Sequence, residues 1–286
     1  MVFEPDIDKR LVAMRFGQRT HRYDAVTPVQ RAMQDELLSR LAARIDGRSV
    51  HRILELGCGT GGLTAKLVDH FPQAQVVVVD LAAEMVDHVR GKGMPVEAIV
   101  ADAEEYVRRD TGRYDLVISN ATVQWFTDPR KTIQICRGLV GPDGLVAFTT
   151  FGDRTFHELA ASFAEAYADL GLIPVPHVLP LASAADWQAW CADSDVDQTE
   201  FISTFADVRA FLRSVQLAGA SLSAGTPRPI SRRVLARMMA CYERRFPAIA
   251  PAGGIGSGAG VRATYHALTI IVRGNSGDAY GAGARP

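Results

Sequence analysis

The segment 52–62, RILELGCGTGG, constrains the fold of this chain more than any other. A short apolar run leads into a glycine-rich turn, in which Gly57, Gly59 and Gly62 match the spacing G-x-G-x-x-G. Glycine has no Cβ, so a turn of this kind lets backbone N–H groups approach a bound ligand closely. Acidic Glu55 lies on the apolar run, two residues before the first glycine. The segment therefore predicts the first strand and turn of a nucleotide-binding α/β fold.

Strand and helix patterns alternate between about residues 52 and 150. Apolar runs predict strands at 53–56, 75–80, 96–101, 114–119 and 145–150. Amphipathic patterns predict helices at 60–70, 82–90 and 128–139, and GPDG predicts a turn at 141–144. Such alternation indicates a parallel sheet with right-handed crossovers, in which ligands bind beyond the carboxyl ends of the strands.

Two largely helical regions flank this alternating part. Residues 11–46 precede it, and helices are expected after it at 156–170, 184–191, 206–218 and 232–245. Two further strands fit around 199–203 and 263–272, and 251–260 reads as a flexible glycine-rich loop. The predicted fold class is α/β, with a mostly parallel seven-stranded sheet, helices on both faces and a helical cap.

We expect five segments along the chain. They are an N-terminal helical cap at 1–46, a ligand-binding core at 47–150, a helical cap and substrate region with a return strand at 151–245, a loop and strand that complete the sheet at 246–272, and a disordered tail at 273–286.

Composition excludes several classes of function. The net charge of −1 over 286 residues argues against bulk electrostatic binding to nucleic acid. No apolar run is long enough to cross a bilayer, and no apolar segment follows a basic start at the amino terminus, so neither a membrane location nor secretion is expected. The four cysteines are far apart and form no C-x-x-C pair, which indicates reduced thiols in the cytoplasm and no metal site.

Polar residues follow the ends of the predicted strands. Asp80 ends the second strand, 23 residues beyond Gly57, where a carboxylate can accept both hydroxyls of a ribose. Asp102 and Ala103 follow the third strand and could bind an adenine through its amino group and ring. Asn120 ends the fourth strand and would face the reacting centre. The alternative for Asp80 and Asp102 is a helix N-cap, a common role for aspartate after a strand.

The sequence ELGCGTG at 55–61 resembles the first motif of the class I S-adenosylmethionine-dependent methyltransferases, and so implies their Rossmann-like fold and their cofactor. By this resemblance the glycines approach the methionine part of the cofactor, and Leu81 and Met85 flank the adenine unless they serve only in helix packing. Arg15 either pairs with the cofactor carboxylate or caps its helix. The implied cofactor-binding set is Arg15, Glu55, Gly57, Gly59, Asp80, Leu81, Met85, Asp102, Ala103 and Asn120.

Further segments are similar to the malonyl-acyl-carrier-protein O-methyltransferases of biotin synthesis. They are RFG at 15–17, YD at 23–24, ISNATVQWF at 118–126, FTTFG at 148–152, TFHEL at 155–159 and ATYHAL at 263–268. The resemblance spans about residues 10–272, whereas the glycine-rich loop and tail depart from it. It implies methyl transfer from S-adenosylmethionine to the free carboxylate of malonyl-acyl-carrier protein, or of malonyl-coenzyme A, early in biotin synthesis.

This reaction needs donors for a carboxylate and no general base, because a carboxylic acid with a pKa near ~4 is already ionised at neutral pH. The residues expected at the reacting centre are Tyr23, Asn120, Gln124 and Trp125. Those expected to bind the acceptor are Tyr23, Gln124, Trp125 and Arg154. The alternatives are a half-buried helix aromatic for Tyr23, a core residue for Trp125 and a solvated surface charge for Arg154. His21, His157 and His266 are expected to be structural or surface residues.

An acidic carrier protein would be steered by a basic rim, for which the candidates are Arg209, Arg213, Arg232, Arg233, Arg244 and Arg245. The alternative is that these arginines lie on solvated helix faces. Three other functions remain open: methylation of another small acid such as trans-aconitate, an NAD-dependent oxidoreductase, which Asp80 and the glycines allow, and a binding module without catalysis.

Overall fold

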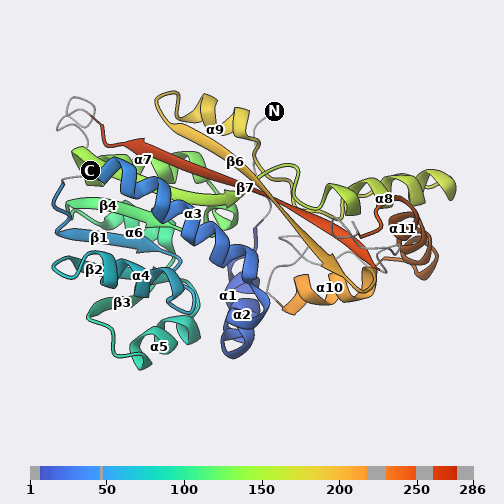
Figure 1. The fold of residues 1–286 in the computed structure, drawn as a ribbon, viewed down its shortest axis with the longest axis horizontal. Coiled ribbons are helices and arrows are strands. Elements are labelled where there is room, and N and C mark those ends of the chain that lie inside the picture. The colour runs from blue at the N-terminus through green and yellow to red at the C-terminus, as the bar shows by residue number, and fades with distance from the viewer. Residues whose placement is uncertain (1–6, 46–47, 218–229, 249–259, 276–286) are drawn as a thin grey trace, which may run out of the picture.

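The computed structural model describes residues 7–45, 48–217, 230–248 and 260–275. Its centre is a seven-stranded sheet with the strand order β3-β2-β1-β4-β5-β7-β6 (Figure 1). The strands are β1 Arg52–Leu56, β2 Gln75–Asp80, β3 Val96–Val100, β4 Tyr114–Ser119, β5 Val140–Phe151, β6 Asp195–Phe205 and β7 Val261–Arg273. Strands β1 to β5 pair in parallel, while β7 runs antiparallel to β5 and β6. The predicted mostly parallel α/β sheet is therefore confirmed.

Helices cover both faces of the sheet because side chains alternate along each buried strand. Val76 and Val78 of β2 join the apolar cluster of α3 Pro28–Ile45, α4 Gly62–His70 and α5 Ala83–Gly91. Val77 and Val79 point to the other face, toward the cluster of the remaining sheet helices. Those helices are α6 Ala103–Arg109, α7 Pro129–Leu139 and α9 Ala184–Trp190.

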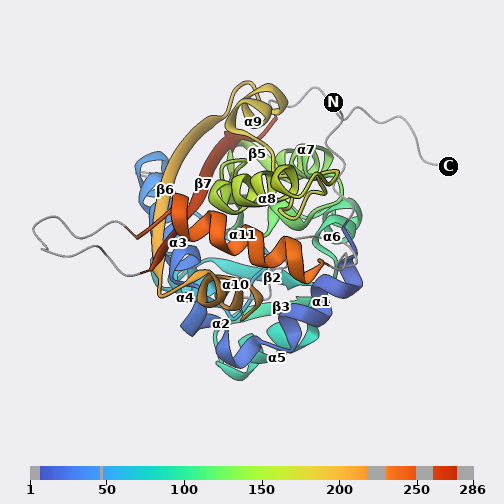
Figure 2. The same ribbon diagram turned by 90° about the vertical axis from the view of Figure 1, so that its right-hand side faces the viewer.

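A second group of helices lies at one end of the molecule, where β6 and β7 extend beyond the rest of the sheet (Figure 1). These helices are α8 His157–Asp169, α10 Val208–Leu217 and α11 Arg232–Arg245, and they enclose an apolar core of their own. α1 Lys9–Gly17 and α2 Thr20–Val26 lie near the middle of the long axis (Figure 1), and Figure 2 shows them below α10 and α11. The carboxyl ends of β1 and β2 border a pocket that residues of α1, α2 and α3 also line.

Some predicted elements differ in the structure. The turn expected at 141–144 lies inside β5, where the register shifts between Tyr114↔Val140 and Leu116↔Leu145. The strand continues because other segments bond its backbone: Gly274 N–H donates to Gly144 O at 3.1 Å, and Arg48 Nη1 donates to Asp143 O at 2.7 Å.

The segments at the carboxyl terminus are only partly described. The predicted loop 251–260 lies outside the described residues apart from Gly260. Of the predicted tail, Arg273 belongs to β7, and the N–H of Asn275 donates to Arg137 O at 3.2 Å. The residues after Asn275 lie outside the description. The division of the chain into five segments stays a prediction, although α3 packs on the sheet through Leu37 and Leu41.

Candidate active site

Two positions of the turn after β1 favour glycine for different reasons. Gly57 has φ +75°, and a Cβ there would lie 2.2 Å from Thr122 Oγ1. Gly59 has φ +52°, but a Cβ there would meet no heavy atom within 4 Å. A side chain at Gly57 would therefore clash with the protein, whereas the backbone at Gly59 faces open space. This open backbone at the carboxyl end of β1 is where a ligand can approach most closely.

Asp80, at the end of β2, is bonded by backbone N–H groups on both carboxylate oxygens. Gly59 N–H donates to Oδ2 at 2.8 Å, and Ala82 N–H donates to Oδ1 at 2.9 Å. Burial raises the pKa of Asp80, and these N–H groups oppose the shift. Because Ala82 is the N-cap of α5, the alternative of Asp80 as that N-cap is wrong. Each oxygen keeps a lone pair for a ligand hydroxyl.

Glu55 on β1 is buried, with 1% of its surface exposed, beside the glycine turn. Thr64 Oγ1 donates a hydrogen bond of 2.6 Å to Glu55 Oε2. Burial, opposed by this hydrogen bond, raises the pKa of Glu55 to about 8. The carboxyl group is therefore mostly protonated and neutral at neutral pH, and it adds no full charge to the site.

Asp102 follows β3. It is the N-cap of α6 and also lines the cavity described below. Its Oδ1 accepts the N–H of Glu104 at 2.9 Å and so caps α6. Lys9 Nζ lies 2.6 Å from Asp102 Oδ2 and also pairs with buried Glu104. This ion-pair cluster ties the start of α1 to the end of β3.

These strand ends border a cavity of about 270 Å³, which we call the cofactor cavity. It brings together most of the predicted residues: Tyr23, Glu55, Gly57, Gly59, Asp80, Leu81, Met85, Asp102, Ala103, Asn120 and Trp125. It also contains residues that the sequence did not reveal, among them Lys9, Phe16, Asp24, Gln30, Gln34, Thr122 and Phe126. Most of these lie on α1, α2 and α3, which reach the strand ends only through the tertiary fold.

The chemistry of this cavity fits a nucleoside with a charged amino-acid tail. Asp80 and Asp102 offer carboxylate oxygens to hydroxyl and amino groups, and buried Met85 offers an apolar surface to a ring. Gln34 Oε1 is buried, lines the cavity and has no hydrogen-bond partner in the structure. A buried acceptor without a partner costs free energy, so a ligand N–H or O–H group would relieve it.

A second cavity of about 370 Å³, which we call the acceptor cavity, adjoins the first. The two cavities share a wall made by Phe16, Tyr23, Gln30, Ala121 and Trp125. The rest of its lining is apolar side chains with a few neutral polar ones, the latter being Gln124, Thr155, Ser203, Thr204, Ser214 and Tyr265. Within the described part of the chain, no charged side chain lines this second cavity.

The segment after β4 forms part of the shared wall and is held by threonines of β5. Ala121 has φ +49°, a strained value for a residue other than glycine, and its N–H donates to Thr149 Oγ1 at 3.0 Å. Asn120 Oδ1 accepts from Thr149 Oγ1 at 2.7 Å, and its Nδ2 donates to Gln30 O at 3.2 Å. Gln124 Nε2 donates to Ala121 O at 2.6 Å. Asn120 therefore joins three elements, while Gln124 keeps one amide hydrogen free of the bonds above.

Aromatic side chains complete the shared wall. The ring of Phe16 packs edge-on against Tyr23, with centroids 6.0 Å apart, and against Trp125 at 5.8 Å. Burial raises the pKa of Tyr23, and the nearby carboxylate of Asp80 adds to the shift. Tyr23 is therefore a neutral phenol, able to donate a hydrogen bond between the two cavities.

Two predicted residues lie elsewhere. Arg154 lines neither cavity and forms an exposed ion pair with Glu200, with Nε and Oε1 3.0 Å apart. Arg15 lines neither cavity and lies on α1, where burial and neighbouring Arg19 lower its pKa. The geometry therefore gives neither arginine a place against the cofactor or the acceptor. Buried His266 bonds Gln198 Oε1 at 3.1 Å and packs under Gly152, a structural position.

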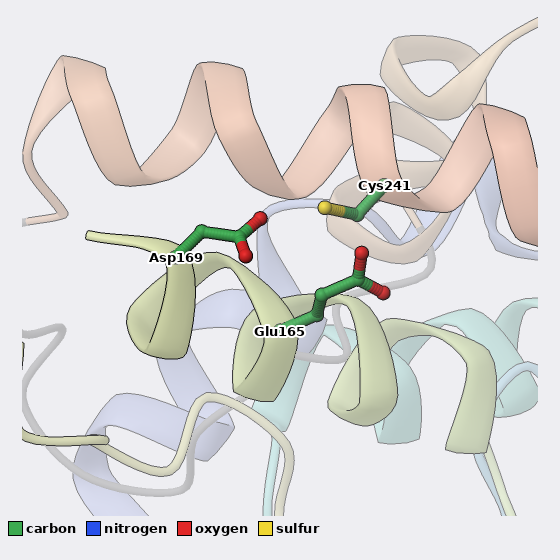
Figure 3. Close-up of side chains that lie close together, drawn as sticks. All are labelled: Glu165, Asp169 and Cys241. Carbon is green, nitrogen blue, oxygen red and sulfur yellow. The ribbon is translucent and has the colours of Figure 1, made fainter. Parts of the chain in front are cut away.

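Among the described residues, one cluster outside the two cavities contains possible metal ligands: Glu165 and Asp169 of α8 face Cys241 of α11 (Figure 3). Arginines of α11 already pair with both carboxylates. Arg237 reaches Asp169, and Arg244 and Arg245 reach Glu165. The cluster therefore joins the two helices by ion pairs and gives no support for a bound cation.

Comparison with known proteins shows which protein family this chain is similar to. A family model described as a methyltransferase domain matches residues 53–144. A malonyl-acyl-carrier-protein O-methyltransferase of Halalkalibacterium halodurans is 36% identical over 252 residues, covering 84% of this chain and 92% of that protein. The protein of the same name from Anoxybacillus flavithermus is 35% identical, covering 94% and 99%.

A solved structure shows the same fold. It is that of a putative methyltransferase from Bacillus halodurans, which is 13% identical, has a TM-score of 0.52, and is matched over 84% of this chain and 97% of that one.

Proposed function

The chain belongs to the malonyl-acyl-carrier-protein O-methyltransferase family, and from this premise we propose that it methylates the free carboxylate of malonyl-acyl-carrier protein, an early step of biotin synthesis. The observation that carries the proposal within this molecule is the pair of adjoining cavities. One has carboxylates and an open glycine backbone, the other has an uncharged lining, and they meet at Tyr23, Ala121 and Trp125. A methyl group can pass between two bound molecules across such a wall.

S-adenosylmethionine, when bound, supplies an electrophilic methyl group on a sulfonium. The cofactor cavity binds and orients it through the strand ends. We assign the ribose hydroxyls to Asp80, whose oxygens are held in place by Gly59 and Ala82. Asp102 is assigned to the adenine amino group, and Leu81 and Met85 to the faces of the ring. Buried Gln34 Oε1, which has no hydrogen-bond partner among the described residues, would accept from the amino group of the methionine part.

The acceptor carboxylate is held by neutral donors. Tyr23 offers its hydroxyl, Trp125 its indole N–H and Gln124 its second amide hydrogen, and all three line the acceptor cavity. Asn120 is a positioning residue in this proposal, because its side chain is bonded to Gln30 and Thr149. No proton is transferred, because the acceptor is ionised before it binds.

The uncharged lining of the acceptor cavity also helps to distinguish between the candidate substrates. Trans-aconitate carries three carboxylates, and two of them would meet apolar side chains such as Val178, Leu179 and Val215 without a counter-charge. A malonyl thioester carries one carboxylate, and its remaining part is neutral where it enters the cavity. The arrangement therefore favours the thioester.

The carrier protein is the preferred partner, with malonyl-coenzyme A as the alternative donor of the same thioester. Exposed Arg209 and Arg213 lie on α10, and exposed Arg232 and Arg233 lie on α11, at the end of the molecule that holds the acceptor cavity. A basic rim there would attract an acidic partner. Arg244 and Arg245 are paired with Glu165 and contribute less. We propose that the reaction takes place in the cytoplasm, where thiols such as the four free cysteines of this chain stay reduced. Among the described residues, no helix combines the length and hydrophobicity needed to span a membrane.

The decisive test is mass spectrometry of malonyl-carrier protein after incubation with the enzyme and S-adenosylmethionine. We expect a mass increase of one methylene group on the malonyl arm and a slower reaction with malonyl-coenzyme A. Faster methylation of free trans-aconitate would replace this proposal with the alternative.

Tyr23→Phe tests the role of the phenol at the shared wall. We expect turnover to fall by about ten-fold or more, because one donor to the acceptor is lost, while the affinity for S-adenosylmethionine changes little. Steady-state kinetics and calorimetry measure the two quantities. Equal losses in turnover and cofactor affinity would contradict the assigned role.

A further inference from the structure

The acceptor cavity presents an electrostatic problem. A carboxylate leaves water to enter it, yet the lining contributed by the described residues contains no lysine, arginine or histidine. Burying an unpaired carboxylate is costly unless a counter-charge is close. Neutral donors such as Tyr23 and Trp125 offset only part of that cost. A counter-charge must therefore come from outside this described lining.

Cations near the shared wall are already engaged with other groups. Lys9 and Lys66 line the cofactor cavity and not the acceptor cavity. Lys9 Nζ lies against Asp102 and Glu104, and Lys66 Nζ lies 2.6 Å from Asp35 Oδ1.

Arg31 also lines the cofactor cavity alone, and its Nη1 donates to the backbone O of Asp24 at 2.5 Å. Each of these three cations has a partner on its own side of the wall. None is placed to receive the acceptor.

The reaction itself places a positive charge where the acceptor needs one. A carboxylate oxygen forms a bond to the methyl carbon as the carbon–sulfur bond breaks, and the electron pair of that bond stays on sulfur. One anion and one sulfonium thus give a neutral ester and a neutral thioether. For methyl transfer between the two cavities, the sulfonium would have to lie at the shared wall, because oxygen, carbon and sulfur must be in line.

We propose that the acceptor carboxylate takes its counter-charge from the cofactor sulfonium and not from the described lining of the acceptor cavity, so that this cavity binds its substrate tightly only while the cofactor still carries its methyl group and positive charge. This inference rests on the proposed function. A fixed arginine in this wall would stabilise the ionic ground state more than the transition state, in which both charges are disappearing. The uncharged lining avoids that loss, and after the transfer the ester group and the thioether sulfur that face it are both neutral. It also prevents fresh acceptor from trapping the spent cofactor.

The test compares acceptor affinity for two complexes of the enzyme. One contains S-adenosylhomocysteine, which is neutral at sulfur, and the other contains sinefungin, whose protonated amine takes the place of the sulfonium. Calorimetry with malonyl-pantetheine should show binding at least about ten-fold tighter to the sinefungin complex. The methyl ester of malonyl-pantetheine is the control ligand, and it should bind both complexes equally.

A substitution at the shared wall tests the same proposal by changing the charge of the protein instead of the charge of the bound nucleoside. Gln30 lines both cavities, so Gln30→Lys introduces a cation there, and Gln30→Met is the matched neutral control. We expect Gln30→Lys to raise the affinity of the S-adenosylhomocysteine complex for malonyl-pantetheine toward that of the sinefungin complex. Gln30→Met should keep the difference. Circular dichroism of both variants checks that they fold.

The outcomes separate the two proposals. Equal affinity of malonyl-pantetheine for both wild-type complexes would overturn the inference, even if methyl transfer to the thioester is observed. Absence of methyl transfer to any malonyl thioester would instead overturn the proposed function, whatever the binding data show.

Discussion

At the scale of single residues, the two glycines of the turn after β1 serve different purposes. Gly57 is enclosed, because any Cβ there would collide with Thr122 of the segment after β4. Gly59 is open to the cofactor cavity. Both have positive φ, which glycine adopts without strain. The same motif therefore holds the protein together at one position and leaves room for a ligand at the next.

Gly57→Ala should destabilise the protein by about 1–3 kcal/mol or more, since it adds a left-handed alanine and a steric clash. Gly138→Ala on α7 is the control, because a Cβ there meets no heavy atom within 4 Å. It should change stability by less than about 1 kcal/mol, in the stabilising direction. Urea unfolding measures both, and equal effects would contradict the packing argument.

Glu55 makes the stability of the protein depend on pH. Its pKa is about 8 in the folded protein and 4.5 as an ordinary value. The folded state therefore favours the protonated form, and this contribution is complete below about pH 4.5 and is lost as the pH rises through about 8.

Glu55→Gln should remove that loss, because the amide stays neutral and can still accept from Thr64. The free energy of unfolding of wild type, minus that of the variant, should decrease as the pH rises from about 5 to about 8. Urea unfolding at several pH values measures the difference. A difference independent of pH would show that Glu55 is ionised throughout.

At the scale of elements, α1 is attached to the sheet end by one side chain more than by its apolar face. Lys9 bonds Asp102 and Glu104, while Val12 and Gly17 are its only buried residues. Burial opposes ionisation of Glu104, but Lys9 and the N–H groups of Thr127 and Asp128 outweigh it and lower its pKa to about 2. The ion pair is therefore intact at neutral pH, and α1 closes one side of the cofactor cavity.

Lys9→Met should loosen α1 without unfolding the sheet. We expect faster amide hydrogen exchange in Lys9–Gly17, faster dissociation of S-adenosylmethionine, and a lower thermal midpoint because buried Glu104 loses its counter-charge. Lys131→Met, at an exposed lysine of α7, is the control and should change neither rate. Unchanged exchange in α1 of the Lys9 variant would show that its other contacts suffice.

At the scale of the whole molecule, the apolar interior is divided. Two clusters lie on the two faces of the sheet, a third lies among α8, α10, α11 and the start of β7, and a smaller fourth joins α3 to β7 through Val29, Met33 and Ala267. The acceptor cavity borders the third cluster through Phe156 and Val215, whereas the cofactor cavity borders the sheet clusters through Leu63 and Ala103. A substitution in the third cluster can therefore change stability and acceptor binding there while cofactor binding at the sheet is kept.

Phe211→Ala tests this division. Phe211 is fully buried in the third cluster, with ring centroids 5.1 Å from Phe156 and 5.3 Å from Phe205. We expect a loss of about 3–5 kcal/mol in stability and a strong loss of acceptor binding, while cofactor affinity is largely kept. Leu217→Ala, at an exposed position of α10, is the control. Parallel loss of both ligands would show that the two ends unfold together.

The sequence by itself determined the parts of the protein that depend on local patterns. The run 75–80 is apolar on both faces and forms β2 between two layers of helices. Pro129 begins α7 after the N-cap Asp128, as its missing N–H allows. The glycines with Asp80, Asp102 and Asn120 were placed at strand ends, and parallel strands bring such ends to one edge of a sheet. These features need only neighbours in the chain and the rules of parallel sheets.

The tertiary structure alone decided what surrounds those strand ends. Lys9, Phe16 and Gln34 reach the cofactor cavity because the N-terminal helices fold back on the sheet, and their own sequence pattern does not specify where they dock. Arg154 looked suited to the acceptor, yet it pairs with Glu200 outside both cavities. The uncharged acceptor cavity is built from segments far apart in the chain, so its chemistry exists only once they are packed together.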